Sequence, residues 1–353
     1  GLINKRQLLR NTLAFSGGLR VLETVTPWSG LLVLNYHRIG SPDGSLLDHA
    51  LWSATIDDFD EHVRLLKKSS EVIGLDELPG AVAELQRSNE LSRHSKTRFS
   101  MITFDDGYLD NFELAFPVLK SHSVAGVFFI TTGFLDTGRL AWWDEIAWMV
   151  RSSQRSEIAL PEEWQLPELG LDAARKAKSI QTLLRCYYQL DGERPAAFLE
   201  DVAAATGSGR APSDASAGLW MNWDNVREMR QSGMSIGAHT VNHPVLSRLP
   251  FEDQNAEIAE SRLRLEQELG ESVTALSYPV GSQQAFNADT RMALEQNDFD
   301  WAFSYYGGFV NRSDFGESRG FDRLNIPRVA VESDTSRSEV RSICSLPQVF
   351  ARH

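Results

Sequence analysis

The stretch Ser100-Met101-Ile102-Thr103-Phe104-Asp105-Asp106-Gly107 places two adjacent carboxylates directly after an apolar run. The run predicts a buried strand, and the glycine permits a sharp turn where the strand ends. The carboxyl ends of strands are where α/β barrels carry their active sites. Asp-Asp-Gly is also ordinary turn chemistry, so this stretch by itself leaves a purely structural interpretation open.

Similar apolar runs recur along the chain and alternate with amphipathic helical patterns. The predicted strands are residues 31–36, 99–104, 124–131, 235–238, 275–278, 301–304 and 327–331. The predicted helices are residues 56–68, 111–121, 223–231, 251–269 and 287–297. This alternation is typical of repeated βα units built on a parallel sheet. The sequence therefore predicts an α/β fold.

Residues 135–219 interrupt the alternation. The segment is helical or loop-like and rich in tryptophan, and we interpret it as an insertion. Its small-residue tract over 203–218 predicts a flexible loop. A lid, a dimer interface and a partner surface all remain open as its role.

Composition and charge exclude several classes of protein. The chain has 353 residues, of which 42% are hydrophobic, so it can bury a large core. Its formal charge of −13 is relieved by no basic run, which makes nucleic-acid binding unfavourable. Cys186 and Cys344 are too few for a disulfide framework or a cysteine-based zinc site. No apolar stretch approaches the roughly 20 residues of a membrane span.

A second candidate for chemistry is the pair of histidines in His239-Thr240-Val241-Asn242-His243, which follows the predicted strand 235–238. This spacing lets both imidazoles face one ion. Two histidines with one carboxylate leave coordination positions open for water and substrate, as in catalytic zinc sites. The histidine pair and the Asp-Asp-Gly stretch together are more specific than either alone.

The segments 103–107 and 239–243 resemble the first two motifs of the polysaccharide deacetylases, carbohydrate esterase family 4 with its NodB-like homology domain. Ser277-Tyr278-Pro279-Val280-Gly281 resembles a third motif of that family. The resemblance covers about residues 30–135 and 220–332, and it implies a distorted (β/α)7 TIM-like barrel. It does not explain the helical insertion.

Carried over to this chain, the resemblance implies a divalent cation held by Asp106, His239 and His243. Zn²⁺ is the expected ion, with Co²⁺, Ni²⁺ and Mn²⁺ as alternatives. Asp105 would be the general base that takes a proton from water. The implied activity is removal of N-acetyl groups from the amino sugars of a bacterial-type glycan. A backbone N–H near Val280 would help to stabilise the oxyanion that forms.

The general acid departs from the usual pattern. Members of the family commonly supply a histidine from a late strand, whereas the only histidine after His243 is His353. The stretch Leu32-Val33-Leu34-Asn35-Tyr36-His37-Arg38 resembles a branch of the family in which that strand lies near the N-terminus. We infer that His37 is the acid, with a hydrogen-bonded core histidine as the alternative.

The residue that orients the base departs as well. Ser277 stands where the family often has an arginine, and Arg328 is the candidate replacement, although it could instead pair with another carboxylate. Tyr278 and Pro279 are further candidates for the site. Trp143, in Trp142-Trp143-Asp144, could stack on a sugar, and a helix packing its tryptophans on the barrel explains it equally well.

Residues 31–332 are the predicted barrel, with the insertion at about 135–219 and an extension over 333–353. Residues 1–30 have a helical period that fits packing on the domain or lying on a membrane surface. They lack a clear signal-peptide pattern, so we expect a cytoplasmic protein, with the inner membrane face and a lost N-terminal signal as alternatives. A deacylase or deformylase of a lipid-linked or small amide, and a catalytically silent glycan-binding scaffold, are the competing functions.

Overall fold

The computed structural model describes residues 28–91, 97–315 and 320–351, so most of the predicted N-terminal helical segment lies outside the described residues. Seven parallel strands form a closed barrel. They are β1 (Gly30–Tyr36), β5 (Arg98–Phe104), β6 (Val127–Ile130), β9 (Ser235–Ala238), β10 (Ala275–Ser277), β11 (Trp301–Gly307) and β13 (Ile326–Ala330). Strand β1 pairs with both β5 and β13, which closes the sheet. The seven predicted strands and the (β/α)7 barrel are confirmed.

Two additional strands distort the barrel. Strand β12 (Phe309–Asn311) pairs antiparallel with the first half of β1, while β13 pairs with its second half. Strand β4 (Glu71–Val72) lies beside β5. The short strands β2 (Arg38–Ile39) and β3 (Trp52–Ala54) form a separate pair.

Alternate residues of the barrel strands point inward, because successive side chains of a strand face opposite sides. The lower interior is apolar and contains Leu31, Val33, Phe99, Met101, Val127, Phe129, Ala275, Phe303 and Ile326. One step further along the strands, the same inward register reaches the buried polar residues Asn35, Thr103, Asp105, Ser277 and Arg328. The strand period thus gathers polar groups at the carboxyl end of the barrel.

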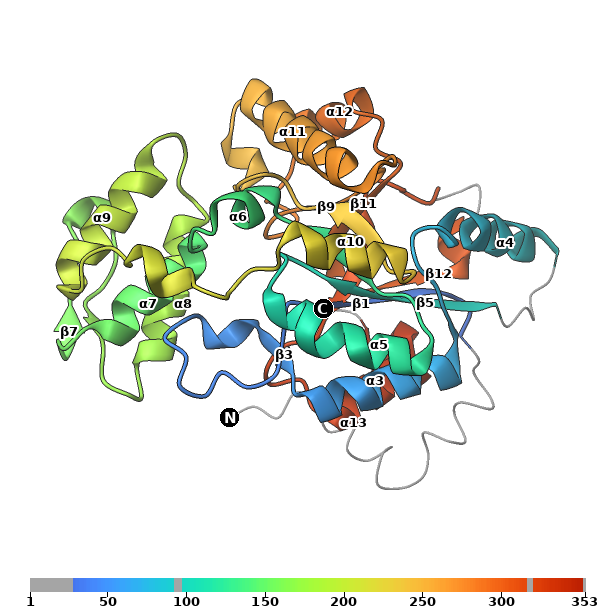
Figure 1. Ribbon diagram of the computed structural model, residues 1–353, viewed down its shortest axis with the longest axis horizontal. Helices are drawn as coiled ribbons and strands as arrows, with labels where there is room; N and C mark the ends of the chain where they lie inside the picture. The colour runs from blue at the N-terminus through green and yellow to red at the C-terminus, as the bar shows by residue number, and fades with distance from the viewer. Residues whose placement is uncertain (1–27, 92–96, 316–319, 352–353) are drawn as a thin grey trace.

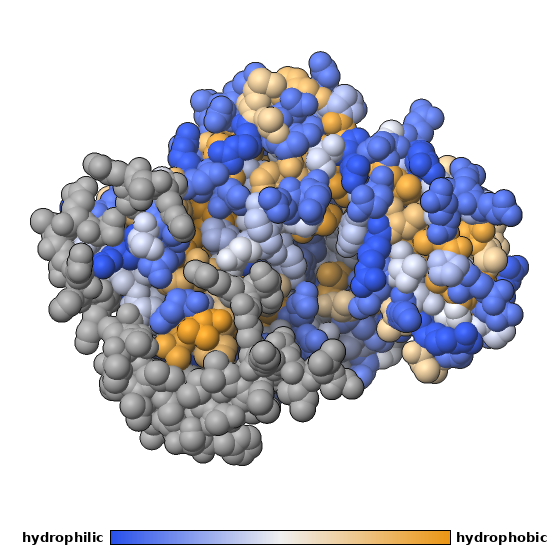
Figure 2. Space-filling model, turned by 180° about the vertical axis from the view of Figure 1, so that it is seen from behind, coloured by the Kyte–Doolittle hydropathy of each residue, from blue (hydrophilic) through white to orange (hydrophobic). Residues whose placement is uncertain are grey.

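Helices cover the outside of the barrel, and the five predicted helices are confirmed (Figure 1). They are α3 (Ile56–Ser69), α5 (Phe116–His122) after a π-helical turn (Asn111–Ala115), α10 (Trp223–Gln231), α11 (Phe251–Leu269) and α12 (Ala288–Gln296). The remaining outer helices are α4 (Leu78–Leu91), α13 (Arg337–Ser345), which packs on α3, and α14 (Pro347–Phe350). Hydrophilic residues make up most of the coloured surface in Figure 2.

The insertion forms a lobe beside the barrel, drawn in green at the left of Figure 1. It follows α6 (Thr132–Thr137) and contains α7 (Trp142–Ser152), the strand pair β7 (Glu157–Ile158) and β8 (Leu169–Gly170), α8 (Lys176–Tyr187) and α9 (Arg194–Thr206). The lobe has its own apolar cluster. The predicted flexible loop over 203–218 is partly wrong, because α9 continues to Thr206 and buries Val202 and Ala203 against that cluster. Nowhere in the described ranges is a helix long and apolar enough to cross a membrane.

Candidate active site and metal centre

Asp106, His239 and His243 converge at the carboxyl end of the barrel. Asp106 follows β5, and both histidines follow β9. Oδ1 of Asp106 lies 3.4 Å from Nε2 of His239 and 3.5 Å from Nε2 of His243. One ligand atom from each of the three residues falls within 4.8 Å of the others. The structure therefore brings together the three residues that the sequence proposed as metal ligands.

The backbone at this cluster is held in an unusual conformation. Asp106 has φ 82°, His243 has φ 55°, and Val280 in the third motif has φ 62°. Non-glycine residues in this left-handed region are uncommon and cost on the order of 1–3 kcal/mol each, and they gather at functional sites. The strain is tolerated because it turns these residues toward one point at the top of the barrel.

The three side chains fit a cation. His239 Nδ1 lies 2.7 Å from the carbonyl oxygen of Ser277, to which it donates, leaving the Nε2 lone pair directed toward Asp106. Oδ1 of Asp106 is buried and accepts no hydrogen bond from the described residues. A buried carboxylate oxygen in that state is costly unless a positive group meets it. This donor set of two imidazoles and one carboxylate is one that Zn²⁺ accepts.

For two of the three candidate ligands, Asp106 and His243, the pKa shifts favour the protonation states that bind a cation. Burial and the neighbouring His239 lower the pKa of His243 to about 3, so His243 is a neutral imidazole near pH 7. Burial alone would raise the pKa of Asp106, but the surrounding histidines lower it below its ordinary value. An ionised Asp106 and a neutral His243 are the forms that bind a metal.

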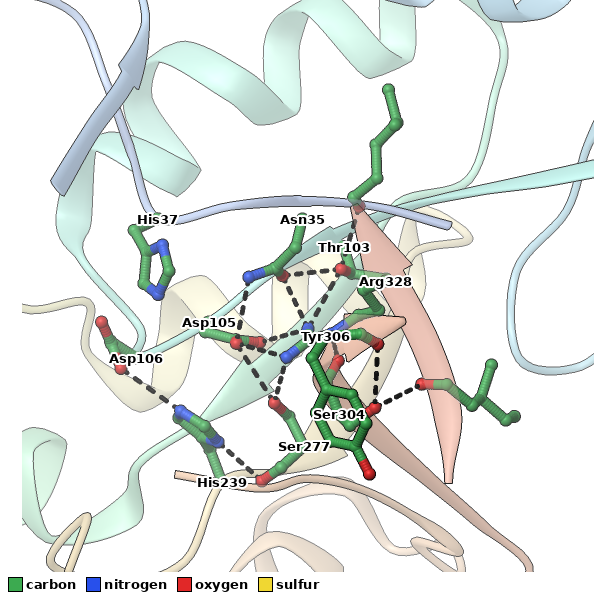
Figure 3. A network of polar contacts seen from close by, with 12 residues as sticks. Asn35, His37, Thr103, Asp105, Asp106, His239, Ser277, Ser304, Tyr306 and Arg328 are labelled. Carbon is green, nitrogen blue, oxygen red and sulfur yellow. Dashed lines mark hydrogen bonds and ion pairs between the residues drawn. The ribbon is translucent and has the colours of Figure 1, made fainter. Parts of the chain in front are cut away.

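Asp105 lines the same cavity as this cluster and is held by a buried hydrogen-bond network (Figure 3). Arg328 donates from Nη1 and Nη2 to its two oxygens, at 2.9 and 2.8 Å. Ser277 Oγ donates to Oδ2 at 3.1 Å, and Asn35 Nδ2 lies 3.3 Å from the same oxygen. Burial would raise the pKa of Asp105, but the Arg328 guanidinium and His239 hold it well below its usual range. Asp105 is therefore ionised and firmly oriented.

Arg328 is the guanidinium that meets the base, as the sequence suggested for the position left by Ser277. It is fully buried, and its remaining donors reach the Ser304 carbonyl at 2.8 Å and Asn35 Oδ1 at 2.6 Å. Arg328 therefore lies behind Asp105, and it is not among the residues that line the cavity. Direct contact with a substrate does not fit this position.

His37 lies at the end of β1, where its imidazole points toward Asp105 and Asp106 (Figure 3). Its backbone is fixed on both sides. The N–H donates to Ser53 Oγ at 3.0 Å, and the carbonyl accepts from Asn111 Nδ2 at 2.7 Å. The side chain lines the same cavity as the three candidate ligands, which is the placement that a general acid requires.

The third motif contributes to the cavity unevenly. Tyr278 and Val280 line a cavity of about 270 Å³ above the candidate ligands. The Tyr278 hydroxyl, however, donates away from the site to the Leu324 carbonyl at 2.7 Å. Pro279 does not line the cavity, and its carbonyl instead accepts the N–H of Gly281 at 2.6 Å. Within the described part of the chain, the N–H of Val280 has no protein acceptor.

Residues 92–158 and 203–302 match the family model for polysaccharide deacetylases, and the unmatched stretch between them falls inside the insertion. The chain carries a polysaccharide deacetylase domain. It is 30% identical over 89 residues to YxkH of Bacillus subtilis (strain 168), which is named for the same family. That match covers 25% of this chain and 31% of YxkH, so it spans under a third of that relative.

Solved structures share the fold of the deacetylase domain. The Streptococcus pyogenes deacetylase PplD in complex with acetate has a TM-score of 0.54 at 16% identity, covering 92% of this chain and 99% of its own. IcaB from Ammonifex degensii has a TM-score of 0.53 at 19% identity, covering 90% and 97%. At such identities the likeness shows the (β/α)7 fold.

Trp142 and Trp143 of α7 pack against the apolar cluster of the insertion and also reach the cavity, and stacking of Trp143 on a sugar stays a prediction. Trp142 and Trp143 line the cavity, and both also brace a candidate ligand. Trp142 Nε1 donates to the His243 carbonyl at 3.2 Å, and the Trp143 ring lies edge-on to the His243 imidazole at 4.4 Å. Asp144, next in the chain, is fully buried and bonded within the protein, so it is not placed to contact a sugar.

Sequence reasoning missed several residues that line the cavity of the deacetylase domain. They are Asp48, Ala50, Leu51, Gln181, Leu184, Arg185, Tyr188, Tyr305, Val331 and Glu332. Most come from loops or from the insertion, outside the three motifs. Tyr305 alone had a readable signal, because it continues the inward alternation of β11 after Phe303.

Proposed function

We propose that this chain hydrolyses the N-acetyl groups of amino sugars in a glycan, with a divalent cation held by Asp106, His239 and His243. The observation that carries the proposal is the position of Asp105. Asp105 is an ionised carboxylate that lines the cavity beside the candidate ligands. Arg328 binds both of its oxygens, and Asp105 is not one of the three candidate ligands. A base next to a Lewis-acid site is the arrangement that amide hydrolysis requires.

The state of Asp105 explains why a cation is needed. Because Arg328 keeps the pKa of Asp105 below its usual range, Asp105 is always available to accept a proton but is a weak base. When bound, a divalent cation such as Zn²⁺ would lower the pKa of the attacking water to about 7 and polarise the acetyl carbonyl. Asp105 then accepts the proton of that water as it attacks.

Two further groups act on the reacting amide. The N–H of Val280, which has no acceptor within the described residues, can donate to the acetyl oxygen as negative charge develops there. His37 lines the cavity and, when protonated, can give its proton to the nitrogen of the departing amine. The amine and acetate are the products.

A second candidate is hydrolysis of a lipid-linked amino sugar or of another small amide. Its support is the size of the cavity, because about 270 Å³ is slightly below the roughly 300–1,000 Å³ typical of ligand pockets. Helices α7 and α8 of the insertion line it as well. Such a space suits a single ring better than a long oligomer.

The test combines metal content with acetate release from N-acetylglucosamine oligomers, before and after chelation and after restoration with zinc or cobalt. We expect about one ion per chain and acetate release that chelation abolishes and metal restores. Bound metal without acetate release would reject the glycan substrate and favour the small amide. Failure to bind any metal would overturn the proposed hydrolase.

A further inference from the structure

Asp48 is a buried carboxylate that lines the catalytic cavity without belonging to the ligand cluster. It is 7% exposed. Its Oδ1 caps the short helical turn His49–Leu51 by accepting the N–H of Ala50 at 3.1 Å. Its Oδ2 accepts no hydrogen bond from the residues that the structure describes, and it is not among their buried unpartnered atoms. This oxygen therefore faces the cavity, where it can accept a hydrogen bond from a ligand.

Tyr188, which caps the C-terminal end of α8, brings a hydroxyl to the same space from the insertion. Burial, with the nearby negative charges of Asp48 and Asp106, raises the pKa of Tyr188 to about 12, so its hydroxyl stays protonated and able to donate at neutral pH. Within the described ranges that hydroxyl has no protein partner. Tyr188 is therefore near both carboxylates and free to bind a ligand.

One face of helix α8, with its C-cap residue Tyr188, lies along the cavity. Gln181, Leu184, Arg185 and Tyr188 all line it, and their spacing of three, four and seven residues is that of a single helical stripe. On the neighbouring side, Ile180 and Leu183 are buried in the apolar cluster of the insertion. Packing within the insertion thus holds α8 in place. Toward the cavity, α8 presents polar side chains that can donate or accept hydrogen bonds and one apolar side chain, Leu184.

A buried chain of contacts fixes Asp48 relative to the metal centre. Asp48 N–H donates to Asp144 Oδ1 at 2.9 Å, and Tyr108 Oη donates to Asp144 Oδ2 at 2.7 Å. Trp143 Nε1 donates to Tyr108 Oη at 2.8 Å, and the Trp143 ring packs on His243. A subsite held in place before binding loses less entropy when the ligand arrives.

We propose that Asp48 and Tyr188 form a hydroxyl-binding subsite for the sugar ring whose acetamido group lies at Asp106. Asp48 accepts from one ring hydroxyl and Tyr188 donates to another. Leu51 and Leu184 cover the apolar surface of the ring. This inference rests on the proposed function, and it names the substrate as a pyranose with free hydroxyls rather than an amide without them.

The test compares two probes, the N-acetylglucosamine tetramer and 4-methylumbelliferyl acetate, which has no sugar hydroxyls. For Asp48→Asn and for Tyr188→Phe, the ratio of kcat/KM for the tetramer to kcat/KM for the ester should fall about tenfold, the loss of one good hydrogen bond. Zinc content measured on the same samples reports whether the ligand cluster is intact. An unchanged ratio in both variants would overturn the subsite.

Matched controls are available next to each position. Asp43→Asn changes an exposed carboxylate in the same loop, and Tyr187→Phe changes the adjacent tyrosine, whose ring stacks on Trp142 at 4.1 Å and does not line the cavity. Both should keep the wild-type ratio.

A binding measurement separates this inference from the proposed function. If the wild-type chain released acetate from neither probe, the proposed function would fail, and calorimetric titration of the zinc-loaded chain with the tetramer would decide the subsite. Affinity about tenfold weaker in Asp48→Asn and Tyr188→Phe would support it. Equal affinity in all three chains, or no binding by the wild type, would overturn it.

Discussion

Arg328 Nη1 and Nη2 donate to Oδ1 and Oδ2 of Asp105 at 2.9 and 2.8 Å, so a guanidinium on β13 holds the carboxylate proposed as the base in a bidentate pair. Ser277, at the position where a family arginine was expected, also donates to Asp105 and accepts from Arg328 Nη2 at 2.8 Å. The small serine leaves room for the arginine that arrives from another strand. The site therefore keeps the pair of an arginine and Asp105, but the arginine comes from β13 rather than from the position of Ser277.

Removing that guanidinium should cost both stability and activity. Arg328→Met leaves Asp105 buried without its partner, which should lower the free energy of unfolding by about 3–5 kcal/mol in urea denaturation. Arg328 lowers the pKa of Asp105, so its loss should raise that pKa and move the acid limb of the kcat/KM profile to higher pH. Arg323→Met, which removes an exposed pair with Asp300, should change stability little.

A rescue variant tests whether the low pKa of Asp105 requires only a guanidinium or requires one placed on β13. Ser277→Arg in the Arg328→Met background returns a guanidinium to the position that the family often uses, and it should move the acid limb back toward lower pH. An acid limb that stays where Arg328→Met leaves it would contradict the assigned role of the charge.

Asp105→Asn should remove the base and keep the metal. The amide cannot accept the proton of water, so we expect kcat to fall by about 10²–10⁴-fold while zinc content stays near the wild-type value. Acetate release and metal analysis on one preparation measure both. Substantial turnover in this variant would exclude Asp105 as the base.

His239→Ala should lose metal and activity together, because it removes one of three candidate ligands and the group that donates to the Ser277 carbonyl. Metal analysis after zinc loading and dialysis measures the loss. His122→Ala, which removes a surface histidine paired with Asp60, is the control and should retain zinc. Full zinc occupancy in His239→Ala would place the ion elsewhere.

His37→Ala should slow amide hydrolysis without altering zinc content. A general acid acts only in its protonated form, so removing it should change the way in which kcat depends on pH. The pH dependence of acetate release checks this. A profile parallel to that of the wild type at every pH would assign His37 to packing.

Asp144 should make the stability of the fold depend on pH. Burial raises its pKa to about 7, so the folded chain keeps a proton that the unfolded chain releases above about pH 4. Stability from this group is therefore present at low pH and is lost as pH rises through the window from about 4 to 7, by at most about 4 kcal/mol. The unfolding free energy of the wild type should therefore fall relative to that of Asp144→Asn across that window, whereas a constant difference would contradict this.

Much of the barrel and its catalytic cluster could be read from the sequence because the signals are local. Apolar runs mark strands, and in parallel strands the residue after each run lies at the same end of the barrel. Asp105, Asp106, His239 and His243 each follow such a run. Their meeting at one point was therefore predictable without knowing the order of the strands.

The tertiary structure alone decided which side chains surround that cluster. Asp48 and Tyr188 come from a loop and from the insertion, whose packing depends on the apolar cluster around α7 to α9 rather than on any local motif. Likewise, the strand period predicts that Arg328 points inward, but only barrel closure through β1 and β13 brings it within 3 Å of Asp105. Contacts between residues far apart in the chain depend on how whole elements pack, and one sequence records that only indirectly.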